Sequence, residues 1–366
     1  MGLYLGLISG TSMDAIDAAL VDFDVEPLRV VATSATGFDP ALKSRVSALI
    51  DHAGSVALDE VGQIDVELGR AFARAASSLM QSASVTAGQV TAIGSHGQTL
   101  RHRPDLPAPF TWQIGDPNTL AEMTGVAVVA DFRRRDVAAG GQGAPLLPVF
   151  HDQVFRSDGE DRVIANLGGI ANITILSRDA GVTGFDTGPA NRLLDAWISL
   201  HEGKDFDAGG AWAATGQVDE TLLNELLDEP YLRAAPPKST GRELFNLPWL
   251  QTKLGLFSRR PCDVQATLQQ YTARSVADAL RQYAPGAALY VCGGGAHNAN
   301  LLHAISLLIA PNRVASTAAL GLDPDYVEAI AFAWFAKRTL AGLTSSAGSV
   351  TGAKGARILG GIYRYA

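Results

Sequence analysis

The sequence has few cysteines, no N-terminal signal segment and no long apolar run. Only Cys262 and Cys292 occur, far apart and without metal-ligand spacing, which argues against a disulfide framework and favours a reducing compartment. Met1 is followed at once by a strand pattern, without the basic and apolar regions of a signal peptide. No apolar run approaches the roughly 20 residues that a membrane-spanning helix needs. We therefore expect a cytoplasmic protein with no membrane partner.

An excess of positive charge is also missing. The 366 residues include 29 basic and 37 acidic side chains, which argues against a nucleic-acid partner and favours a small polar ligand. The apolar share is 47% and the charged share 18%, and such a composition supports two domains with sizeable cores. One local basic cluster, at residues 133–135, needs a separate explanation.

Two common nucleotide-binding patterns are absent as well. Neither GxGxxG nor GxxxxGK[ST] occurs, which argues against dinucleotide dehydrogenases and P-loop enzymes. His96 and His102 lack the spacing of a helical zinc pair, so a metallohydrolase is a weak alternative and we predict no protein-held metal site.

What the sequence does contain is a series of glycine-bearing turns. The first lies at residues 9–12, between an apolar strand over 3–8 and a second strand that reaches Asp22. Its glycine permits close backbone approach, and its hydroxyls and N–H groups are suited to a phosphate. An ordinary polar turn explains the stretch equally well.

A second glycine turn follows in the middle of the chain. Residues 163–166 and 172–176 read as a hairpin across Gly168 and Gly169, which suggests two related α/β halves that share a ligand. Late in the chain, Gly293–Gly295 join a strand over 288–292 to a helix over 299–310, an arrangement suited to a nucleotide at a helix N-terminus.

Polar side chains follow the predicted strands. His96 comes after a strand over 90–94 and is either a structural hydrogen-bonding group or a ligand contact. Arg133 follows a strand over 126–130 and is suited to clamp a carboxylate, whereas Arg134 and Arg135 fit a solvated, internally paired loop equally well. Asp186 is predicted in a tight loop before a helix over 192–200, either as a plain loop residue or aimed into a cleft.

Three further charged residues are candidates for the site, and a glycine-rich linker marks the expected domain boundary. Glu328 stands among apolar neighbours of a helix that follows Pro324, either as a paired core residue or as a site residue. Lys238 and Arg242 either face a phosphate or cap neighbouring carbonyls, and we favour capping. The glycines of 140–148 predict a domain boundary, with one lobe over 1–139 and a second over 140–366 whose last segment can pack back on the first.

The order of these turns resembles the sugar kinase, actin and Hsp70 superfamily, and more narrowly the 1,6-anhydro-N-acetylmuramic acid kinase family. The matching sequence motifs run through nearly the whole chain: SGTSMDAID at 9–17, GSHGQTLRHRP at 94–104, DFRRRDVAAGGQGAPL at 131–146, NLGGIAN at 166–172, GFDTGPAN at 184–191, PKSTGRE at 237–243 and VCGGGAHNANL at 291–301.

The resemblance implies an α/β, two-lobed actin-like ATPase fold, with a mixed sheet flanked by helices in each lobe and the active site in the interdomain cleft. It implies an ATP- and Mg²⁺-dependent enzyme of peptidoglycan recycling that opens the anhydro bridge of the sugar with water and phosphorylates O6. A homodimer is also implied. The rivals are a kinase acting on an ordinary hexose or a carboxylate, and a non-catalytic ATP-binding switch of the Hsp70 kind.

The resemblance also assigns roles residue by residue. Asp186 matches the catalytic aspartate, and in our reading it is the base that activates water. The residues that match nucleotide-binding positions are Gly10, Thr11, Ser12, Met13, Asp14, Ala15, Ile16, Asp17, Gly168, Gly169, Gly293, Gly294 and Gly295. Four residues lie in motifs that line the sugar pocket in the family: His96, Gln98, Arg133 and Glu328. The sequence departs from the family pattern at Ala190, where a glycine is usual, and this restricts the loop slightly.

Overall fold

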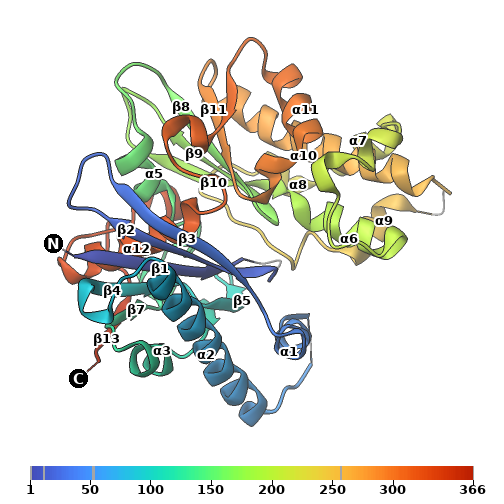
Figure 1. The fold of residues 1–366 in the computed structure, drawn as a ribbon. Helices are drawn as coiled ribbons and strands as arrows, with labels where there is room; N and C mark the ends of the chain where they lie inside the picture. The colour runs from blue at the N-terminus through green and yellow to red at the C-terminus, as the bar shows by residue number, and fades with distance from the viewer. Residues whose placement is uncertain (1, 11–12, 52–53, 256–257, 366) are drawn as a thin grey trace. The chain divides into compact units, whose positions relative to one another are not determined.

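The computed structural model describes residues 2–10, 13–51, 54–255 and 258–365. The chain forms two compact units (Figure 1). Unit 1 comprises residues 1–146 and 326–366, and unit 2 comprises residues 147–325. The chain therefore leaves unit 1 once and returns to it near the C-terminus.

Unit 1 is built on a six-stranded mixed sheet with the order β13-β7-β4-β1-β2-β3. Its strands are β1 (Leu3–Ser9), β2 (Ala15–Asp22), β3 (Arg29–Gly37), β4 (Val90–Ser95), β7 (Val128–Ala130) and β13 (Gly361–Tyr363). β1, β4 and β7 run parallel, while β2, β3 and β13 pair antiparallel with their neighbours. The predicted first hairpin is thus confirmed as β1 and β2.

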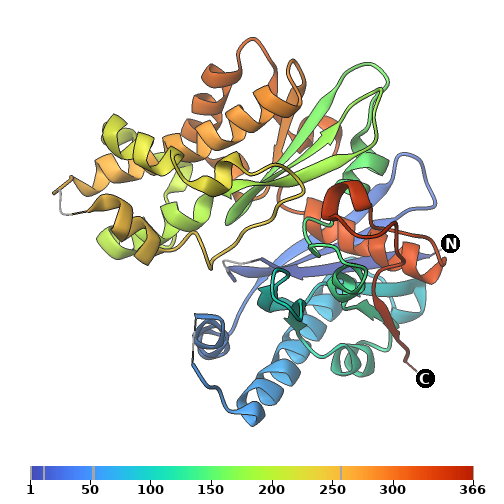
Figure 2. The ribbon, with the colours of Figure 1, turned by 180° about the vertical axis from the view of Figure 1, so that it is seen from behind.

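Helices cover both faces of this sheet (Figure 1; Figure 2). They are α1 (Pro40–Asp51), α2 (Leu58–Ser82), α3 (Pro117–Thr124), α4 (Phe132–Ala138), α12 (Val327–Leu340) and α13 (Gly348–Thr351), with a short 3-10 turn η1 (Ala87–Gln89). Side chains alternate across a strand, so Leu5 and Leu7 of β1 join the core formed with Phe72 of α2. The residue between them, Gly6, faces α12 instead.

Two paired glycines allow α12 to lie close against the sheet. Gly6 of β1 pairs with Gly94 of β4. A Cβ atom at Gly6 would lie 1.8 Å from the carbonyl oxygen of Ala329, and one at Gly94 would lie 1.9 Å from that of Phe332. Because any larger side chain would collide with backbone, glycine at these two positions is a packing requirement.

A separate two-stranded hairpin, β5 (Gln98–Arg103) and β6 (Phe110–Ile114), also belongs to unit 1. The sequence of β6, FTWQI, alternates apolar and polar residues as strands do, whereas that of β5 does not. The sequence of β5 is QTLRHR, with Leu100 as its single apolar residue, so the usual apolar signal of a strand is missing. Its strand conformation comes from pairing with β6.

Unit 2 contains a five-stranded mixed sheet with the order β10-β9-β8-β11-β12. Its strands are β8 (Arg162–Leu167), β9 (Ile170–Leu176), β10 (Thr183–Pro189), β11 (Ala288–Cys292) and β12 (Val314–Ser316). β8, β11 and β12 run parallel. The predicted second hairpin is confirmed as β8 and β9.

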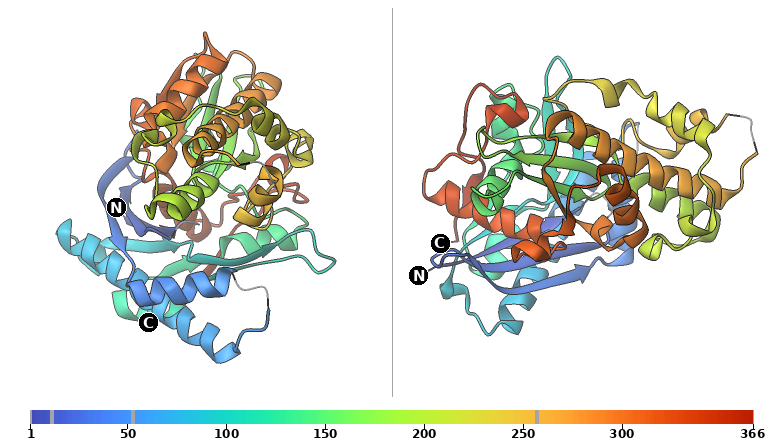
Figure 3. Two further views of the ribbon diagram at one scale, coloured as in Figure 1. Left: turned by 90° about the vertical axis from the view of Figure 1, so that its right-hand side faces the viewer. Right: turned by 90° about the horizontal axis from the view of Figure 1, so that it is seen from above.

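In unit 2, helices α10 and α11 lie side by side over the sheet (Figure 1; Figure 3). The helices are α5 (Pro148–Phe155), α6 (Asn191–Glu202), α7 (Glu220–Leu227), α8 (Pro230–Arg233), α9 (Leu247–Leu254), α10 (Pro261–Tyr283) and α11 (Ala299–Ile309). Short 3-10 turns are η2 (Ala208–Gly210), η3 (Ala213–Thr215), η4 (Gly294–His297) and η5 (Thr317–Leu320). The α/β class, with one mixed sheet flanked by helices in each unit, is confirmed.

The division of the chain differs from the boundary expected at 139/140. Residues 140–146 lie in unit 1 and not in the second unit. Residues 326–366 also lie in unit 1, and the sequence allowed such a return for the last segment. The N–H of Gly143 donates to the carboxylate of Asp136 at 2.8 Å, and the N–H of Gln142 donates to the carbonyl of Thr351 at 2.7 Å. These bonds attach the glycine-rich linker to α4 and α13, so the chain crosses to unit 2 only after Leu146.

Among the helices of the described residues, none is long and apolar enough to cross a membrane.

Candidate functional site

In unit 1, three of the predicted site segments follow parallel strands at one edge of the sheet. Leu7 of β1 pairs with Ser95 of β4, and Ser95 pairs with Ala130 of β7. The N–H of His96 donates to the carbonyl of Leu7 at 2.9 Å. The turn after β1, His96 after β4 and Arg133 after β7 therefore share the carboxyl edge of the sheet, where open α/β sheets bind ligands.

The turn after β1 closes with a hydrogen bond of 3.2 Å from the N–H of Met13 to the carbonyl of Gly10. Met13 is buried and has a positive φ of 56°. Asp14 is exposed and lies 3.4 Å from the ammonium of Lys43. Ala15, Ile16 and Asp17 belong to β2. The predicted phosphate ligands Thr11 and Ser12 lie outside the described residues.

This edge of the sheet also carries two buried hydroxyl groups. The Oγ atoms of Ser9 and Ser95, which end β1 and β4, have no hydrogen-bond partner among the described residues. Buried polar groups are normally satisfied, so such orphaned hydroxyls beside a glycine turn fit a polar ligand such as a phosphate.

The structure brings His96 and Arg133 into direct contact. Nε of Arg133 lies 3.0 Å from Nε2 of His96, and Nη1 of Arg133 donates to the carbonyl of Gly143 at 2.8 Å. His96 is buried, and its Nδ1 lies 2.9 Å from the carbonyl of Gly97. Burial, aided by the neighbouring guanidinium, holds the pKa of His96 well below its usual value.

The other two sugar-side candidates lie on neighbouring elements of unit 1. Gln98 begins β5 and is buried, and its Oε1 has no hydrogen-bond partner among the described residues. Glu328 lies in the first turn of α12, half-buried, one helical turn before Phe332. The ring of Phe332 packs 4.8 Å from that of His96, measured between centroids. Residues i and i+4 share a helix face, so Glu328 lies on the face of α12 that meets His96.

The hairpin β5–β6 adds a polar chain that the sequence did not predict. Nε2 of Gln113 donates to the hydroxyls of Thr99 at 3.2 Å and Thr111 at 2.8 Å, and Nδ1 of His102 lies 3.0 Å from the hydroxyl of Thr111. Burial is the main cause that lowers the pKa of His102 to about 4.

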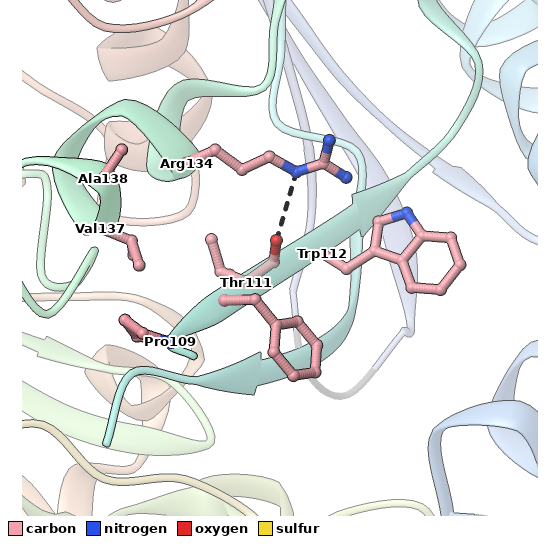
Figure 4. A pocket seen from close by; sticks show the side chains of 7 residues that line it. Pro109, Thr111, Trp112, Arg134, Val137 and Ala138 are labelled. Atoms are coloured by element: carbon pink, nitrogen blue, oxygen red, sulfur yellow. Dashed lines mark hydrogen bonds between the residues drawn. The ribbon is translucent and has the colours of Figure 1, made fainter. Parts of the chain in front are cut away.

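Beside this hairpin lies a pocket of about 290 Å³ (Figure 4). Its lining residues are Pro109, Phe110, Thr111, Trp112, Arg134, Val137 and Ala138. Nε of Arg134 donates to the carbonyl of Thr111 at 3.3 Å and lies 3.4 Å from the carboxylate of Asp131. The internally paired interpretation is therefore confirmed for Arg134, but in helix α4 rather than in a loop. None of the predicted site residues lines this pocket.

In unit 2, Asp186 lies within a strand and not in the predicted loop. It belongs to β10, is 6% exposed and pairs with Asn172 of β9. The sequence GFDTGP suggested a turn because it is rich in turn-forming residues. Pairing with β9 overrides that local preference, and the register shifts between Asp186 and Gly188, a local irregularity in the ladder.

The segment over residues 231–240 holds Asp186 in place. The N–H of Thr240 donates to Oδ2 of Asp186 at 2.9 Å, and the hydroxyl of Tyr231 donates to the Asp186 carbonyl at 2.9 Å. Nζ of Lys238 donates to the carbonyls of Tyr231 at 3.1 Å and Leu232 at 3.0 Å, so the predicted capping role of Lys238 is confirmed. Burial lowers the pKa of this lysine, and the charge of Asp186 opposes that shift.

The two glycine turns of unit 2 meet at the carboxyl edge of β8 and β11, where Cys292 pairs with Asn166. A Cβ atom at Gly293, whose φ is +78°, would lie 2.3 Å from Oδ1 of Asn166. A Cβ atom at Gly295 would lie 2.5 Å from the Cβ of Leu167. The strands therefore require glycine at both positions to pack the late turn against the end of β8.

The turn between β8 and β9 is tied to the start of α6. The carbonyl of Gly168 accepts from the N–H of Asn191 at 3.0 Å, and that of Gly169 accepts from the N–H of Ala190 at 3.0 Å. The helix predicted after Gly293–Gly295, over 299–310, is confirmed as α11 (Ala299–Ile309). The 3-10 turn η4 intervenes, and Asn298 caps α11 by accepting from the N–H of Leu301 at 2.9 Å.

Within the described part of the chain, no group of three or more His, Cys, Asp or Glu side chains is arranged to hold a metal ion.

The family model for anhydro-N-acetylmuramic acid kinase matches residues 2–365. The chain belongs to the anhydro-N-acetylmuramic acid kinase family. It is 52% identical over 365 residues to an anhydro-N-acetylmuramic acid kinase of Xanthomonas campestris, covering 99% of this chain and 97% of that protein. It is 51% identical over 363 residues to the corresponding kinase of Coxiella burnetii, covering 98% of this chain and 97% of that protein.

Two solved structures are similar to this chain at low sequence identity. Component A of the (R)-2-hydroxyglutaryl-CoA dehydratase of Acidaminococcus fermentans is 12% identical, with a TM-score of 0.49 over 93% of this chain and 100% of that chain. A ROK family glucokinase from Streptomyces griseus, in complex with glucose and AMPPNP, is 15% identical, with a TM-score of 0.39 over 92% of this chain and 100% of that chain.

Proposed function

We infer that this protein is an ATP-dependent kinase that opens the 1,6-anhydro ring of 1,6-anhydro-N-acetylmuramic acid and phosphorylates O6. The products are N-acetylmuramic acid 6-phosphate and ADP, and the reaction belongs to peptidoglycan recycling. The observation that carries this inference is identity above 50% to kinases of this name over almost the entire chain. The buried carboxylate of Asp186, fixed by a backbone donor, supports it independently.

Asp186 acts as the general base. It removes a proton from the water that attacks the anomeric carbon C1, so the new C1–O bond forms while the C1–O6 bond of the bridge breaks. General-base catalysis of this kind contributes about 10² to 10⁴-fold to a rate. The hydrogen bond from the N–H of Thr240 orients the carboxylate, which supports this role.

The oxygen released from the bridge is the kinase nucleophile. O6 attacks the γ-phosphorus of ATP in line, the bond to the β-phosphate oxygen breaks and ADP leaves, and the proton taken from water passes to solvent. In such a transfer the protein mainly positions the reactants and stabilises the phosphate charge.

The nucleotide is assigned to the glycine turns. Residues Gly10–Asp17 hold the ATP phosphates, with Thr11 and Ser12 as hydroxyl ligands. The Oγ of Ser9, which has no hydrogen-bond partner among the described residues, supports a polar ligand beside them. In unit 2, Gly168 and Gly169 are assigned to the nucleotide, and Gly293, Gly294 and Gly295 to its adenosine side. Bound Mg²⁺ would supply positive charge against the phosphates. Asp14 or Asp17 would orient it through its water ligands, since Mg²⁺ keeps several waters and few carboxylates.

The sugar site is assigned to the neighbourhood of His96, Gln98, Arg133 and Glu328. Arg133 pairs with the lactyl carboxylate that distinguishes muramic from glucosaminic sugars, because a guanidinium binds a carboxylate through two parallel hydrogen bonds. The buried Oε1 of Gln98, which has no partner among the described residues, supports a polar sugar group beside it.

The protein works as a homodimer, as its family resemblance implies, and in the cytoplasm, the reducing compartment that its low cysteine content favours. Sedimentation-equilibrium analysis of the purified chain, whose mass is 38.4 kDa, tests directly whether the protein is a dimer. A single species at the mass of one chain, at the concentrations used for the kinase assay, would contradict the dimer.

The reaction is tested with ATP, Mg²⁺ and 1,6-anhydro-N-acetylmuramic acid in ¹⁸O-labelled water. We expect the label at C1 together with phosphate on O6, which mass spectrometry and NMR of the product identify. Phosphate on another hydroxyl with the anhydro ring intact would refute the mechanism and favour an ordinary sugar kinase. Absence of any phosphorylated sugar, with ATP bound but not consumed, would favour the switch protein.

A further inference from the structure

The contact between His96 and Arg133 gives His96 a specific task. We propose that His96 is a positioning residue, which orients the guanidinium of Arg133 for the lactyl carboxylate and so sets selectivity for muramic sugars. This inference rests on the proposed function, in which Arg133 binds that carboxylate. It separates His96 from the residues that touch the sugar themselves.

The hydrogen bonds of His96 define which ring nitrogen carries the proton. Nδ1 lies 2.9 Å from the carbonyl of Gly97, and a carbonyl oxygen only accepts, so Nδ1 is the donor. In a neutral ring Nε2 is then an acceptor. Nε2 faces the Nε–H of Arg133 at 3.0 Å, so the neutral ring with its proton on Nδ1 is the form that binds the guanidinium.

The surroundings favour this neutral form. His96 is 6% exposed, and the ring of Phe332 packs against it with centroids 4.8 Å apart. A protonated ring would place a second positive charge next to Arg133 and would replace the acceptor at Nε2 with a donor. The imidazole therefore serves as a fixed acceptor at neutral pH, and not as a proton donor to substrate.

Arg133 is held on a second side by the glycine-rich linker. Its Nη1 donates to the carbonyl of Gly143 at 2.8 Å. The N–H of Gly143 donates to Oδ2 of the fully buried Asp136 at 2.8 Å, and Oδ1 of Asp136 accepts from the hydroxyl of Thr351 at 2.8 Å. The positive φ of Gly143, +71°, is a conformation that glycine adopts without strain.

Two such contacts fix the plane of the guanidinium. The group is planar and rigid, so anchoring both Nε and Nη1 leaves it little freedom to rotate. Bidentate recognition of a carboxylate depends on that plane. His96 is the contact that a side-chain substitution can remove, whereas the contact at Gly143 is made by the backbone.

Two substitutions at position 96 test the inference. In His96→Gln the side-chain amide oxygen reaches the place of Nε2 and can accept from Arg133. In His96→Asn the shorter amide reaches only the place of Nδ1, so the bond to Arg133 is lost. The readouts are KM and kcat for 1,6-anhydro-N-acetylmuramic acid and for the 1,6-anhydro sugar that lacks the lactyl group, with thermal unfolding of each variant as the folding control.

We expect His96→Asn to raise KM for the muramic sugar about tenfold, the size of one charge-assisted hydrogen bond, with kcat within about threefold of the wild type. KM for the sugar without the lactyl group should stay unchanged, so discrimination between the two sugars narrows. His96→Gln should recover most of the discrimination. In the Arg133→Ala background the Asn substitution should have no further effect on KM.

Equal increases in KM for both sugars would overturn the inference, because His96 would then act on a part common to both. The inference would also be overturned if His96→Asn discriminated between the two sugars as well as the wild type does, while Arg133→Ala no longer discriminated between them. The role of Arg133 would then stand. Failure of the wild-type protein to phosphorylate the muramic sugar would instead contradict the proposed function, so the two failures are distinguishable.

Discussion

The backbone N–H of Thr240 donates a hydrogen bond of 2.9 Å to Oδ2 of Asp186, across 54 residues of sequence. A backbone donor cannot rotate away as a side chain can, so it fixes one oxygen of the carboxylate. This arrangement orients the group that we assign as the general base.

Asp186→Asn keeps the size of the side chain and removes its ability to accept a proton. We expect binding of ATP and of the sugar to remain, and kcat to fall by about 10² to 10⁴-fold, the usual contribution of a general base. Calorimetric titration measures the binding and a coupled ADP assay measures the turnover. A variant with a near-normal rate would show that Asp186 is not the base.

Thr240→Pro removes the backbone N–H that holds Asp186, whereas Thr240→Ala keeps it. We expect kcat to fall about tenfold or more in the proline variant, since one oriented hydrogen bond to a charged group is lost. The alanine variant should stay close to the wild type. Equal rates in the two variants, with circular dichroism showing both folded, would count against an orienting role for this bond.

Gly10→Ala separates nucleotide binding from stability. A Cβ atom at Gly10 would meet none of the described residues within 4 Å, so the free energy of unfolding should change by less than about 0.5 kcal/mol. If the turn cradles phosphate, the added methyl group obstructs the approach of backbone to ligand, and KM for ATP should rise several-fold.

Gly37 provides the matched control for this substitution. It ends β3, and a Cβ atom there also meets nothing within 4 Å. Gly37→Ala should leave both stability and KM for ATP unchanged. An unchanged KM for ATP in Gly10→Ala as well would contradict the phosphate assignment of the first turn.

His151 makes the stability of unit 2 sensitive to acid. It is fully buried in α5, and burial lowers its pKa to about 3. The unfolded chain binds a proton at this residue below pH 6.5 or so and the folded chain does not, so stability falls as the pH drops from about 6.5 toward 3. The slope for one such group is about 1.4 kcal/mol per pH unit.

Urea unfolding of wild type and His151→Leu at pH 6.5 and pH 5 measures this contribution. The loss of stability on acidification should be smaller in the variant by about 2 kcal/mol, even though the variant also loses the 2.8 Å contact between Nδ1 and the hydroxyl of Thr174. His303 is exposed, so His303→Leu serves as the control and should keep the wild-type slope. If His151→Leu and His303→Leu lost the same free energy of unfolding between pH 6.5 and pH 5, His151 would be excluded as the source of the acid sensitivity.

Local signals predicted most of the elements. β11 has the predicted bounds, Ala288–Cys292, because a short apolar run is flanked there by glycines. α3 begins at Pro117 with Asp116 as its N-cap, as the residue types require. Signals of this kind depend on neighbours in sequence and need no knowledge of the rest of the chain.

The contacts that shape the site are not local, and the sequence did not reveal them. His96 and Arg133 are 37 residues apart, and Asp136 and Thr351 are 215 residues apart. Asp186 was placed in a loop because glycine and proline surround it, and only pairing with β9 makes that stretch a strand. Residue types therefore identified candidate groups, while the tertiary fold determined which of them touch.

The return of the chain to unit 1 sets an order for folding during synthesis. Unit 2 is formed by one uninterrupted stretch, residues 147–325, whereas α12, α13 and β13 of unit 1 come from the last 41 residues, 326–366. Until the ribosome has released those residues, Gly6 and Gly94 face no helix and one side of the central strands is bare. Unit 2 can thus be complete on the nascent chain while unit 1, begun first, is finished last.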